Sequence, residues 1–239
     1  AVGYQAGVAV TTGTLNTLIG GISGGNLTTG ASNVAVGYNS LGTEDVGQHN
    51  VAIGRDALAT QNTATAANIY NTAVGSSAGA EITTGQFNTL IGGLSGDALT
   101  TGAQNVAIGY SALTTDDLGS HSVAVGPSAL FSQNFATATN SYNTAVGSSA
   151  GGAVTTGVQN TIIGGLAGDA LTDADHNVAI GYAALTADTL GSRSVAIGNG
   201  ALSTQNHTTA TSAYNTAVGD AAGEAVTTSV QNTLIGARA

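Results

Sequence analysis

A five-residue pattern, in which a polar residue precedes alternating β-branched and small residues and then glycine, recurs along the whole chain. One copy is Asn105-Val106-Ala107-Ile108-Gly109. Position 2 of the pattern is Val or Thr, position 4 is Val or Ile, and position 3 is mostly Ala, with Leu or Ile in some copies. This period of two predicts a short β-strand with two faces that both favour burial. One face would fill the interior of a coil and the other would meet a neighbouring chain, and the pattern leaves open which is which.

The spacing of the copies is regular. Successive copies from Asn71 to Asn143 begin in steps of 17, 17, 17 and 21, which sum to 72, and the same steps repeat from Asn143. Such a period predicts an all-β fold, a parallel β-roll or β-solenoid with 17-17-17-21-residue coils, because each repeat is too small to bury its apolar side alone. The chain is therefore a single repeat array, 1–239, with 72-residue superrepeats at 1–70 (partial), 71–142, 143–214 and 215–239 (partial).

Position 1 is a polar residue in every complete copy. Stacked coils would bring these side chains about 4.8 Å apart, which favours a ladder of Asn hydrogen bonds along the stack. The alternative is that Asn supplies only a turn conformation. Ser122 and Ser194 take this place in two copies, and the candidate ladder consists of Asn16, Asn33, Asn50, Asn71, Asn88, Asn105, Asn143, Asn160, Asn177, Asn215 and Asn232.

Position 5 is glycine in every complete copy, which predicts a backbone site with positive φ or with no room for a Cβ atom. These strand-end glycines are Gly20, Gly37, Gly54, Gly75, Gly92, Gly109, Gly126, Gly147, Gly164, Gly181, Gly198, Gly219 and Gly236. Outer turns that close the coils are predicted at the recurring Thr-Thr-Gly segments, such as the one that begins at Thr100.

Every fourth coil is four residues longer than the others and ends in tyrosine. These coils are 50–70, 122–142 and 194–214, and each contains a Gln-Asn pair, at Gln61, Gln133 and Gln205. Insertions in repeat proteins map to loops on one face, so we expect the additional residues to project outward.

Acidic residues recur once in each 72-residue unit. Glu44-Asp45 and Asp116-Asp117 occupy the same place, with Ala187-Asp188 next, and His49, His121 and Arg193 follow five residues after the first acid. One interpretation is a repeated ion site or acid/base pair. The sequence favours the other, a solvated outer turn with a weak salt bridge, because the third unit has one acid and an arginine, which cannot bind a metal. His176 and His207 have no counterparts in other units and are expected at the surface.

Charge and composition exclude several classes of function. The net charge is −10, with three arginines and no lysine, so there is no basic stripe for nucleic acid and no lysine for a phosphate-binding loop. No apolar run is long enough for membrane insertion of this segment. We expect no catalytic residue, no metal site and no cofactor. Because the chain begins and stops within a repeat, we expect a segment of a longer polypeptide whose targeting and anchoring parts lie elsewhere.

Four stretches, Asn105–Ala112, Ser122–Ala129, Asn177–Ala184 and Ser194–Ala201, resemble the head repeats of YadA-like trimeric autotransporter adhesins. That resemblance extends coil by coil along the chain and implies a left-handed parallel β-roll that assembles as a homotrimer or a longer filament. The family's repeat is shorter, and the surplus here lies in the outer turn. The Thr-Thr-Gly arrays are also similar to those of phage tail fibres.

The predicted function is a non-catalytic structural or adhesive fibre segment of an extracellular appendage, a phage tail fibre or a trimeric surface adhesin. Its partners would be copies of itself and a host-surface glycan or protein. One alternative is an ice- or surface-binding β-solenoid that uses the aligned Thr of the Thr-Thr-Gly turns. A further alternative is glycan binding along Tyr38, Tyr110 and Tyr182, which share one register and would otherwise cover a seam between neighbouring chains.

Overall fold

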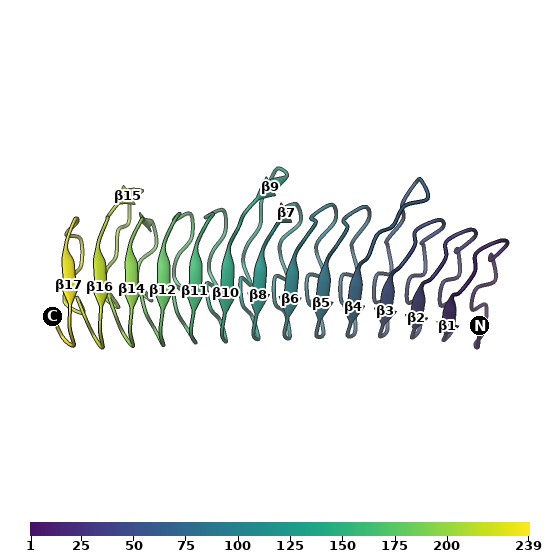
Figure 1. Ribbon diagram of the computed structural model, residues 1–239, viewed down its shortest axis with the longest axis horizontal. Coiled ribbons are helices and arrows are strands. Elements are labelled where there is room, and N and C mark those ends of the chain that lie inside the picture. Colours follow the sequence, from purple (N-terminus) through teal and green to yellow (C-terminus); the bar gives the residue numbers. More distant parts are fainter.

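The protein is a rod of stacked coils (Figure 1) in a computed structural model that describes residues 1–239. The prediction of an all-β parallel solenoid is confirmed: the chain forms no helix and winds through about 13 turns. None of its segments is a helix with the length and hydropathy needed to cross a membrane. The strands are β1 (Thr17–Ile19), β2 (Val34–Val36), β3 (Val51–Ile53), β4 (Thr72–Val74), β5 (Thr89–Ile91), β6 (Val106–Ile108), β7 (Gly119–Ser120), β8 (Val123–Val125), β9 (Thr139–Asn140), β10 (Thr144–Val146), β11 (Thr161–Ile163), β12 (Val178–Ile180), β13 (Gly191–Ser192), β14 (Val195–Ile197), β15 (Thr211–Ser212), β16 (Thr216–Val218) and β17 (Thr233–Ile235).

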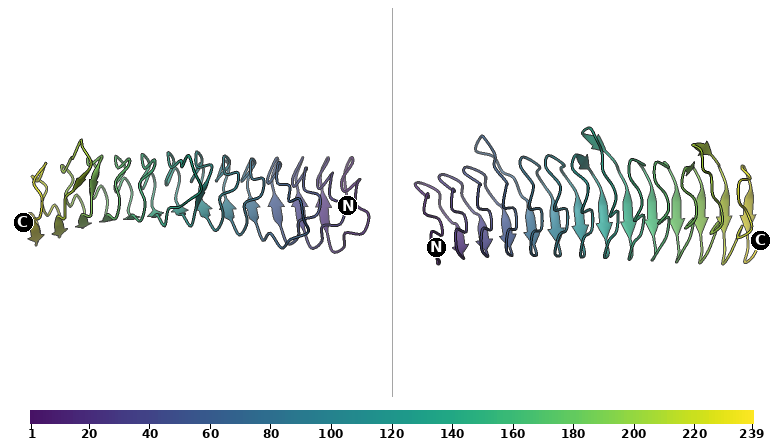
Figure 2. Two further views of the ribbon diagram at one scale, coloured as in Figure 1. Left: turned by 90° about the horizontal axis from the view of Figure 1, so that it is seen from above. Right: turned by 180° about the vertical axis from the view of Figure 1, so that it is seen from behind.

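Positions 2 to 4 of the 13 complete copies form one parallel sheet along the rod (Figure 2). The register follows the repeat. Val106 in β6 pairs with Val123 in β8, across a short coil, and Val123 pairs with Thr144 in β10, across a long coil. Equivalent positions of successive coils therefore form straight rows along the rod.

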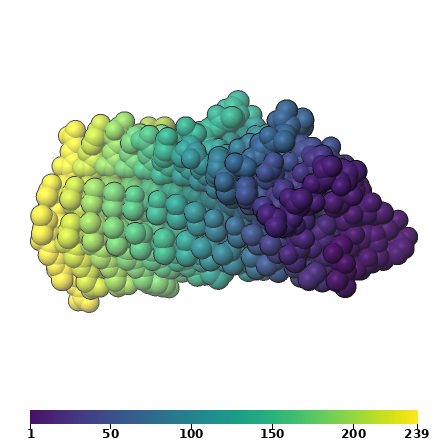
Figure 3. Space-filling view, turned by 45° about the vertical axis from the view of Figure 1, so that its right-hand side comes forward, coloured from purple at the N-terminus to yellow at the C-terminus, as the bar shows by residue number.

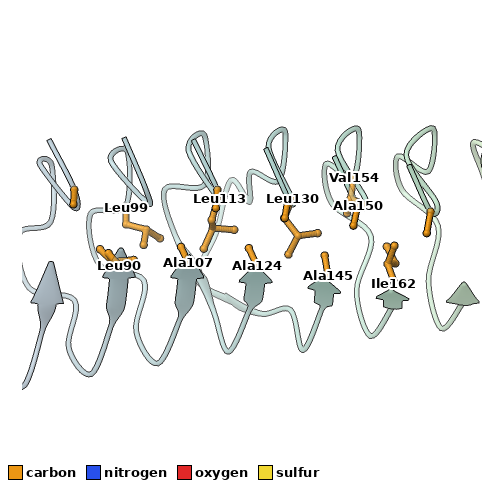
Figure 4. Packing of buried hydrophobic residues seen from close by; sticks show 14 of the residues in the cluster. Leu90, Leu99, Ala107, Leu113, Ala124, Leu130, Ala145, Ala150, Val154 and Ile162 are labelled. Atoms are coloured by element: carbon orange, nitrogen blue, oxygen red, sulfur yellow. The ribbon is translucent and has the colours of Figure 1, made fainter. Parts of the chain in front are cut away.

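The core lies between this sheet and the returning segment of each coil. Position 3 points inward and is buried in almost every strand, as for Leu90, Ala107 and Ile162 (Figure 4). Positions 2 and 4 point outward, which answers the question that the sequence left open. Side-chain volumes on the strand and on the returning segment of a coil compensate for each other. In one coil the small Ala107 of the strand lies opposite the large Leu113, and in another the large Leu90 lies opposite Gly96. An added Cβ on Gly96 would lie 2.8 Å from Cδ2 of Leu90, so a large strand residue requires glycine there.

The strand-end glycines lie where the backbone of the next coil leaves no room for a Cβ atom. Gly109 has a φ of 137°, and an added Cβ would lie 2.6 Å from the carbonyl carbon of Gly126 in the next coil. That distance is shorter than real non-bonded Cβ contacts, and the φ value is one that glycine alone adopts without strain. The same geometry recurs from Gly20 to Gly219.

Long coils project from one edge of the rod (Figure 1). Two of the projections are closed by short parallel pairs, β7 with β9 and β13 with β15. The equivalent contact in the first unit is an isolated bridge between Gln48 and Asn68. The sequence predicted the outward loops but not these additional strands, which are only two residues long.

Candidate interaction face

The outward side of the 13-stranded sheet is a continuous, uncharged and mainly apolar surface, which we call the outer sheet face and define as positions 2 and 4 of all copies. Each copy contributes one Val or Thr and one Val or Ile. The position-4 side chains remain partly exposed, with Ile53 at 38% and Ile91 at 39%. Figure 3 shows that equivalent side chains line up in rows along the rod. Soluble monomers rarely expose an apolar surface this long, so the face is a candidate interaction site.

Two further rows border the outer sheet face. The leading row is the residue before each position 1, and the trailing row is the residue after each strand-end glycine. Of the 13 carboxylate side chains in the chain, Asp220 is the only one in the leading row, the trailing row or the outer sheet face. Two of the three arginines, Arg55 and Arg193, lie in the bordering rows. The other carboxylates lie inside the coils or on other sides of the rod.

The leading row is held in one conformation by its backbone and by stacking. Its residues all have a positive φ, for example 61° at His49 and 55° at Tyr70. His49 stacks on Tyr70 with ring centroids 5.0 Å apart, and Tyr70 stacks on Phe87 at 6.0 Å. In the later units His121 packs on Tyr142, and Arg193 lies over the ring of Tyr214. These tyrosines were located from the sequence as the ends of the long coils, but the row that they belong to was not identified.

The trailing row contains the three tyrosines proposed as recognition residues. Tyr38, Tyr110 and Tyr182 are exposed to between 58% and 63%. Each ring lies beside a glycine of the preceding coil, so that an added Cβ on Gly93 would lie 3.7 Å from Cδ2 of Tyr110. Tyr4 belongs to the same row, is 78% exposed, and was not singled out from the sequence because its coil is incomplete.

The position-1 asparagines join successive coils. Oδ1 of Asn105 accepts the backbone N–H of Ser122 at 2.8 Å, and Nδ2 of Asn105 donates to the carbonyl of Gly119 at 2.9 Å. All position-1 asparagines except the last, Asn232, accept the position-1 N–H of the next coil in this way. An unpaired buried N–H costs about 1–3 kcal/mol, so each of these side chains stabilises the contact between two coils.

The interpretation of the acidic residues as a solvated turn was wrong. Glu44, Asp116 and Asp188 are fully buried, and these three are the equivalent residues of the three units. His49, His121 and Arg193 do not pair with them but stack in the leading row. The sequence reasoning failed because it placed the acids outside the coil, whereas they occupy position 12, the inward place that Leu99 and Leu171 fill in other coils.

Each buried carboxylate anchors the long coil that follows it. Oδ2 of Asp116 accepts a hydrogen bond from Nε2 of Gln133 at 2.6 Å, and Oδ1 accepts the backbone N–H of Gly119. Oε1 of Gln133 in turn accepts from Nδ2 of Asn143. In the first unit Glu44 accepts three successive backbone N–H groups, those of residues 45 to 47, and a bond from Gln61. The signal that could have revealed this cluster is the acid and glutamine at the same position of adjacent coils.

His207 was expected at the surface but is 5% exposed, which corrects that expectation. Its backbone N–H donates to Oδ1 of Asp188, and its Nδ1 lies 3.4 Å from Oδ2 of Asp188. No group of three or more His, Cys, Asp or Glu side chains is arranged to hold a metal ion. The largest surface hollow, about 410 Å³, is lined by residues that include Phe131, Leu166 and Asp169, and none of the buried carboxylates lines it.

Burial raises the pKa of Asp116 above its ordinary value of 3.8, against the opposing effect of hydrogen bonds from Gln133 and Gly119. The folded protein therefore binds this proton more tightly than the unfolded chain does. We expect the free energy of unfolding contributed by Asp116 to fall as pH rises from 3.8 through the raised pKa, by at most about 1.4 kcal/mol per pH unit. Denaturant unfolding measured across this pH range should give a slope of unfolding free energy against pH, and the Asp116→Asn substitution should reduce that slope. An identical slope in the variant would contradict this assignment.

Comparisons with protein-family models, with curated proteins and with solved structures find no match to this chain. The features of the chain that bear on its function are the repeat and the surface that the repeat builds.

Proposed function

We propose that the protein is a non-catalytic structural and adhesive fibre segment of an extracellular appendage, in which three copies pack lengthwise through their outer sheet faces. The observation that carries the proposal is the uncharged β-branched surface that runs across all 13 strands of the main sheet. The resemblance to YadA-like head repeats and to phage tail fibres supports a trimer on a cell or virion surface.

The size of the face suits such an assembly. Thirteen strands at about 4.8 Å spacing give a length of ~60 Å, and the distance from the leading row to the trailing row is ~20 Å. The product, ~1,200 Å², exceeds the roughly 800 Å² that each partner buries in a standard interface. The segregation of carboxylates away from the face also favours contact between identical chains, because like charges would otherwise repel across it.

The proposal is tested by sedimentation equilibrium over a range of protein concentrations. We expect a mass three times that of the 23.0 kDa chain. The mass should persist in ~1 M salt, because an apolar interface is not screened by ions. A stable monomer at micromolar concentration would contradict the proposal.

Ice or surface binding is a second candidate that one observation favours. The outer sheet face is a regular array of Thr, Val and Ile rows. Its threonines are those of position 2, whereas the sequence had suggested the threonines of the Thr-Thr-Gly turns. A face covered by sister chains cannot bind ice, so a monomer that shows thermal hysteresis would support this candidate over the fibre. Glycan binding to Tyr38, Tyr110 and Tyr182 is compatible with a fibre only if these rings remain exposed in the assembly.

A further inference from the structure

The surface hollow of about 410 Å³ is built by three successive coils, those that contain β8, β10 and β11. We call it the central hollow and define it by Ser128, Phe131, Ser132, Ser149, Leu166 and Asp169. These residues occupy positions 7, 10 and 11 of their coils, so none belongs to the outer sheet face or to its bordering rows. From the first coil to the third the hollow spans about 10 Å along the rod, which is enough for one sugar ring.

Backbone hydrogen bonds join the three coils that line the central hollow. The N–H of Ser132 donates to the carbonyl of Gly152 at 3.1 Å, and the N–H of Ala153 donates to the carbonyl of Asp169 at 3.1 Å. Both bonds belong to the regular stacking of the coils. The hollow is therefore formed before any ligand arrives, which lowers the ordering cost of binding.

The polar groups of the central hollow are free to bind a ligand. The hydroxyls of its three serines form no hydrogen bond within the chain, whereas those of Ser122 and Ser141 bond to each other in the core. Oδ1 of Asp169 accepts a hydrogen bond from the hydroxyl of Thr186, and Oδ2 has no partner in the chain. Three hydroxyls and one carboxylate oxygen are thus available at the surface.

The apolar wall of the hollow contains an aromatic ring that the fold does not require. Phe131 is 41% exposed, whereas Phe135 of the same coil is 4% exposed. The residues equivalent to Phe131 in the neighbouring units are Ala59 and Ser203. Because the long coil forms equally well with a small residue there, the ring of Phe131 is explained by a ligand better than by folding.

The hollow is also kept open only in the middle unit. Gly152 and Ala153 lie between its apolar and polar walls, and each equivalent pair in the other units includes a glutamate. These pairs are Ala80-Glu81 and Glu224-Ala225. The aromatic ring and the two small residues therefore occur together once in the chain.

This combination of groups selects one class of ligand. A pyranose ring packs the C–H bonds of one face against an aromatic ring, and its hydroxyls both donate and accept hydrogen bonds. A purely apolar ligand would leave the serines and Asp169 without partners. An anion would be repelled by Asp169, since no arginine lines the hollow. The volume of about 410 Å³ falls in the range of ligand pockets, roughly 300–1,000 Å³.

We infer that the central hollow binds one pyranose unit of a carbohydrate, with the apolar face of the sugar on Phe131 and its hydroxyls bonded to Asp169 and the serines. The inference rests on the adhesive part of the proposed function and gives that function a site. It does not depend on assembly, because every lining residue belongs to one chain. It also differs from glycan binding along Tyr38, Tyr110 and Tyr182, which lie in the trailing row.

Nuclear magnetic resonance titration of the full chain tests the inference. The probes are the methyl pyranosides of glucose, galactose, mannose and N-acetylglucosamine, added one at a time. We expect saturable binding of at least one of them, with a dissociation constant on the order of 1 mM. Saturation transfer from the protein should be strongest at the ring C–H protons that pack on Phe131.

Two variants remove the site with residues that the repeat itself accepts. Phe131→Ala introduces the residue found at Ala59, and Ala153→Glu introduces the residue found at Glu81, so both should fold. We expect each to raise the dissociation constant at least about tenfold, because one loses the aromatic surface and the other fills the hollow. The control is Tyr110→Ala, which should bind the sugar as the unaltered chain does. Circular dichroism checks that all three variants remain folded.

The outcomes separate this inference from the proposed fibre. Absence of saturable binding to every pyranoside, or unchanged binding by folded Phe131→Ala, would overturn the inference even if sedimentation gives a trimer. Loss of binding in Tyr110→Ala alone would assign the sugar to the trailing row and would also overturn it. A monomer that binds a pyranoside through Phe131 would support the inference and refute the trimer.

Discussion

Replacement of both Ile91 and Ile108 by glutamate should convert the proposed trimer into single chains. Both residues belong to position 4 of adjacent copies, in the centre of a face that carries no charge. In the assembly each new carboxylate would be removed from water without a cationic partner, which costs several kcal/mol per group. We expect the dissociation constant to rise by at least about a thousandfold, which corresponds to roughly 4 kcal/mol. Sedimentation equilibrium measures the change directly.

The fold of the single chain should survive this substitution, because Ile91 is already 39% exposed and points away from the core. The matched control is Thr84→Glu/Thr101→Glu, which adds the same charges to the outer turns of two adjacent coils, one of which also contains Ile91. The register equivalent of Thr101 in the next unit is Asp173, so a carboxylate is tolerated there. The control should remain trimeric with an unchanged circular dichroism spectrum. Equal dissociation in the two variants would show that net charge, and not the outer sheet face, governs assembly.

The Gly109→Ala substitution should produce a large loss of stability although it adds only one methyl group. The Cβ atom would lie 2.6 Å from backbone atoms of Gly126, and the backbone has a φ of 137°. Backbone in the next coil cannot move aside as a flexible side chain can, so two coils must separate. We expect a cost of more than about 3 kcal/mol from strain and overlap together. Denaturant unfolding measures this cost as a lowered midpoint.

Gly93→Ala, one coil away, is the control. Gly93 has no positive φ, and its added Cβ would make an ordinary contact of 3.7 Å with the ring of Tyr110. We expect a change within about 1 kcal/mol, with stabilisation favoured because alanine restricts the unfolded chain. If the two alanine variants had equal stability, the close approach of the strand-end glycines would not be a determinant of the fold.

The locations of the strands could be predicted from the sequence because local pattern and global repeat agree. Each copy alternates in period two and ends in glycine, and the short and long steps between copies reappear as the register of the parallel sheet. The additional pairs β7–β9 and β13–β15 could not be predicted, since a two-residue strand has no period. In both units the long coil that contributes to the pair is also hydrogen-bonded to a buried carboxylate, through Gln133 to Asp116 and through Gln205 to Asp188.

The burial of Asp116 illustrates a second limit. From its chemistry alone, a carboxylate that lies next to a second acid in a turn-like segment is expected to be exposed to solvent. The decisive facts are that position 12 points inward and that Gln133 of the next coil supplies a donor. Both facts concern neighbours that lie a whole coil away along the chain, so they appear only after the coils are stacked.

The sequence by itself determined the solenoid, its period and the close-contact glycines, because those features repeat and each copy reinforces the others. Only the tertiary structure decided which face of the strand points inward. Both faces are apolar, so hydrophobicity could not choose between them. The choice depends on volume, since Ala107 and Leu113, or Leu90 and Gly96, fill the narrow interior together.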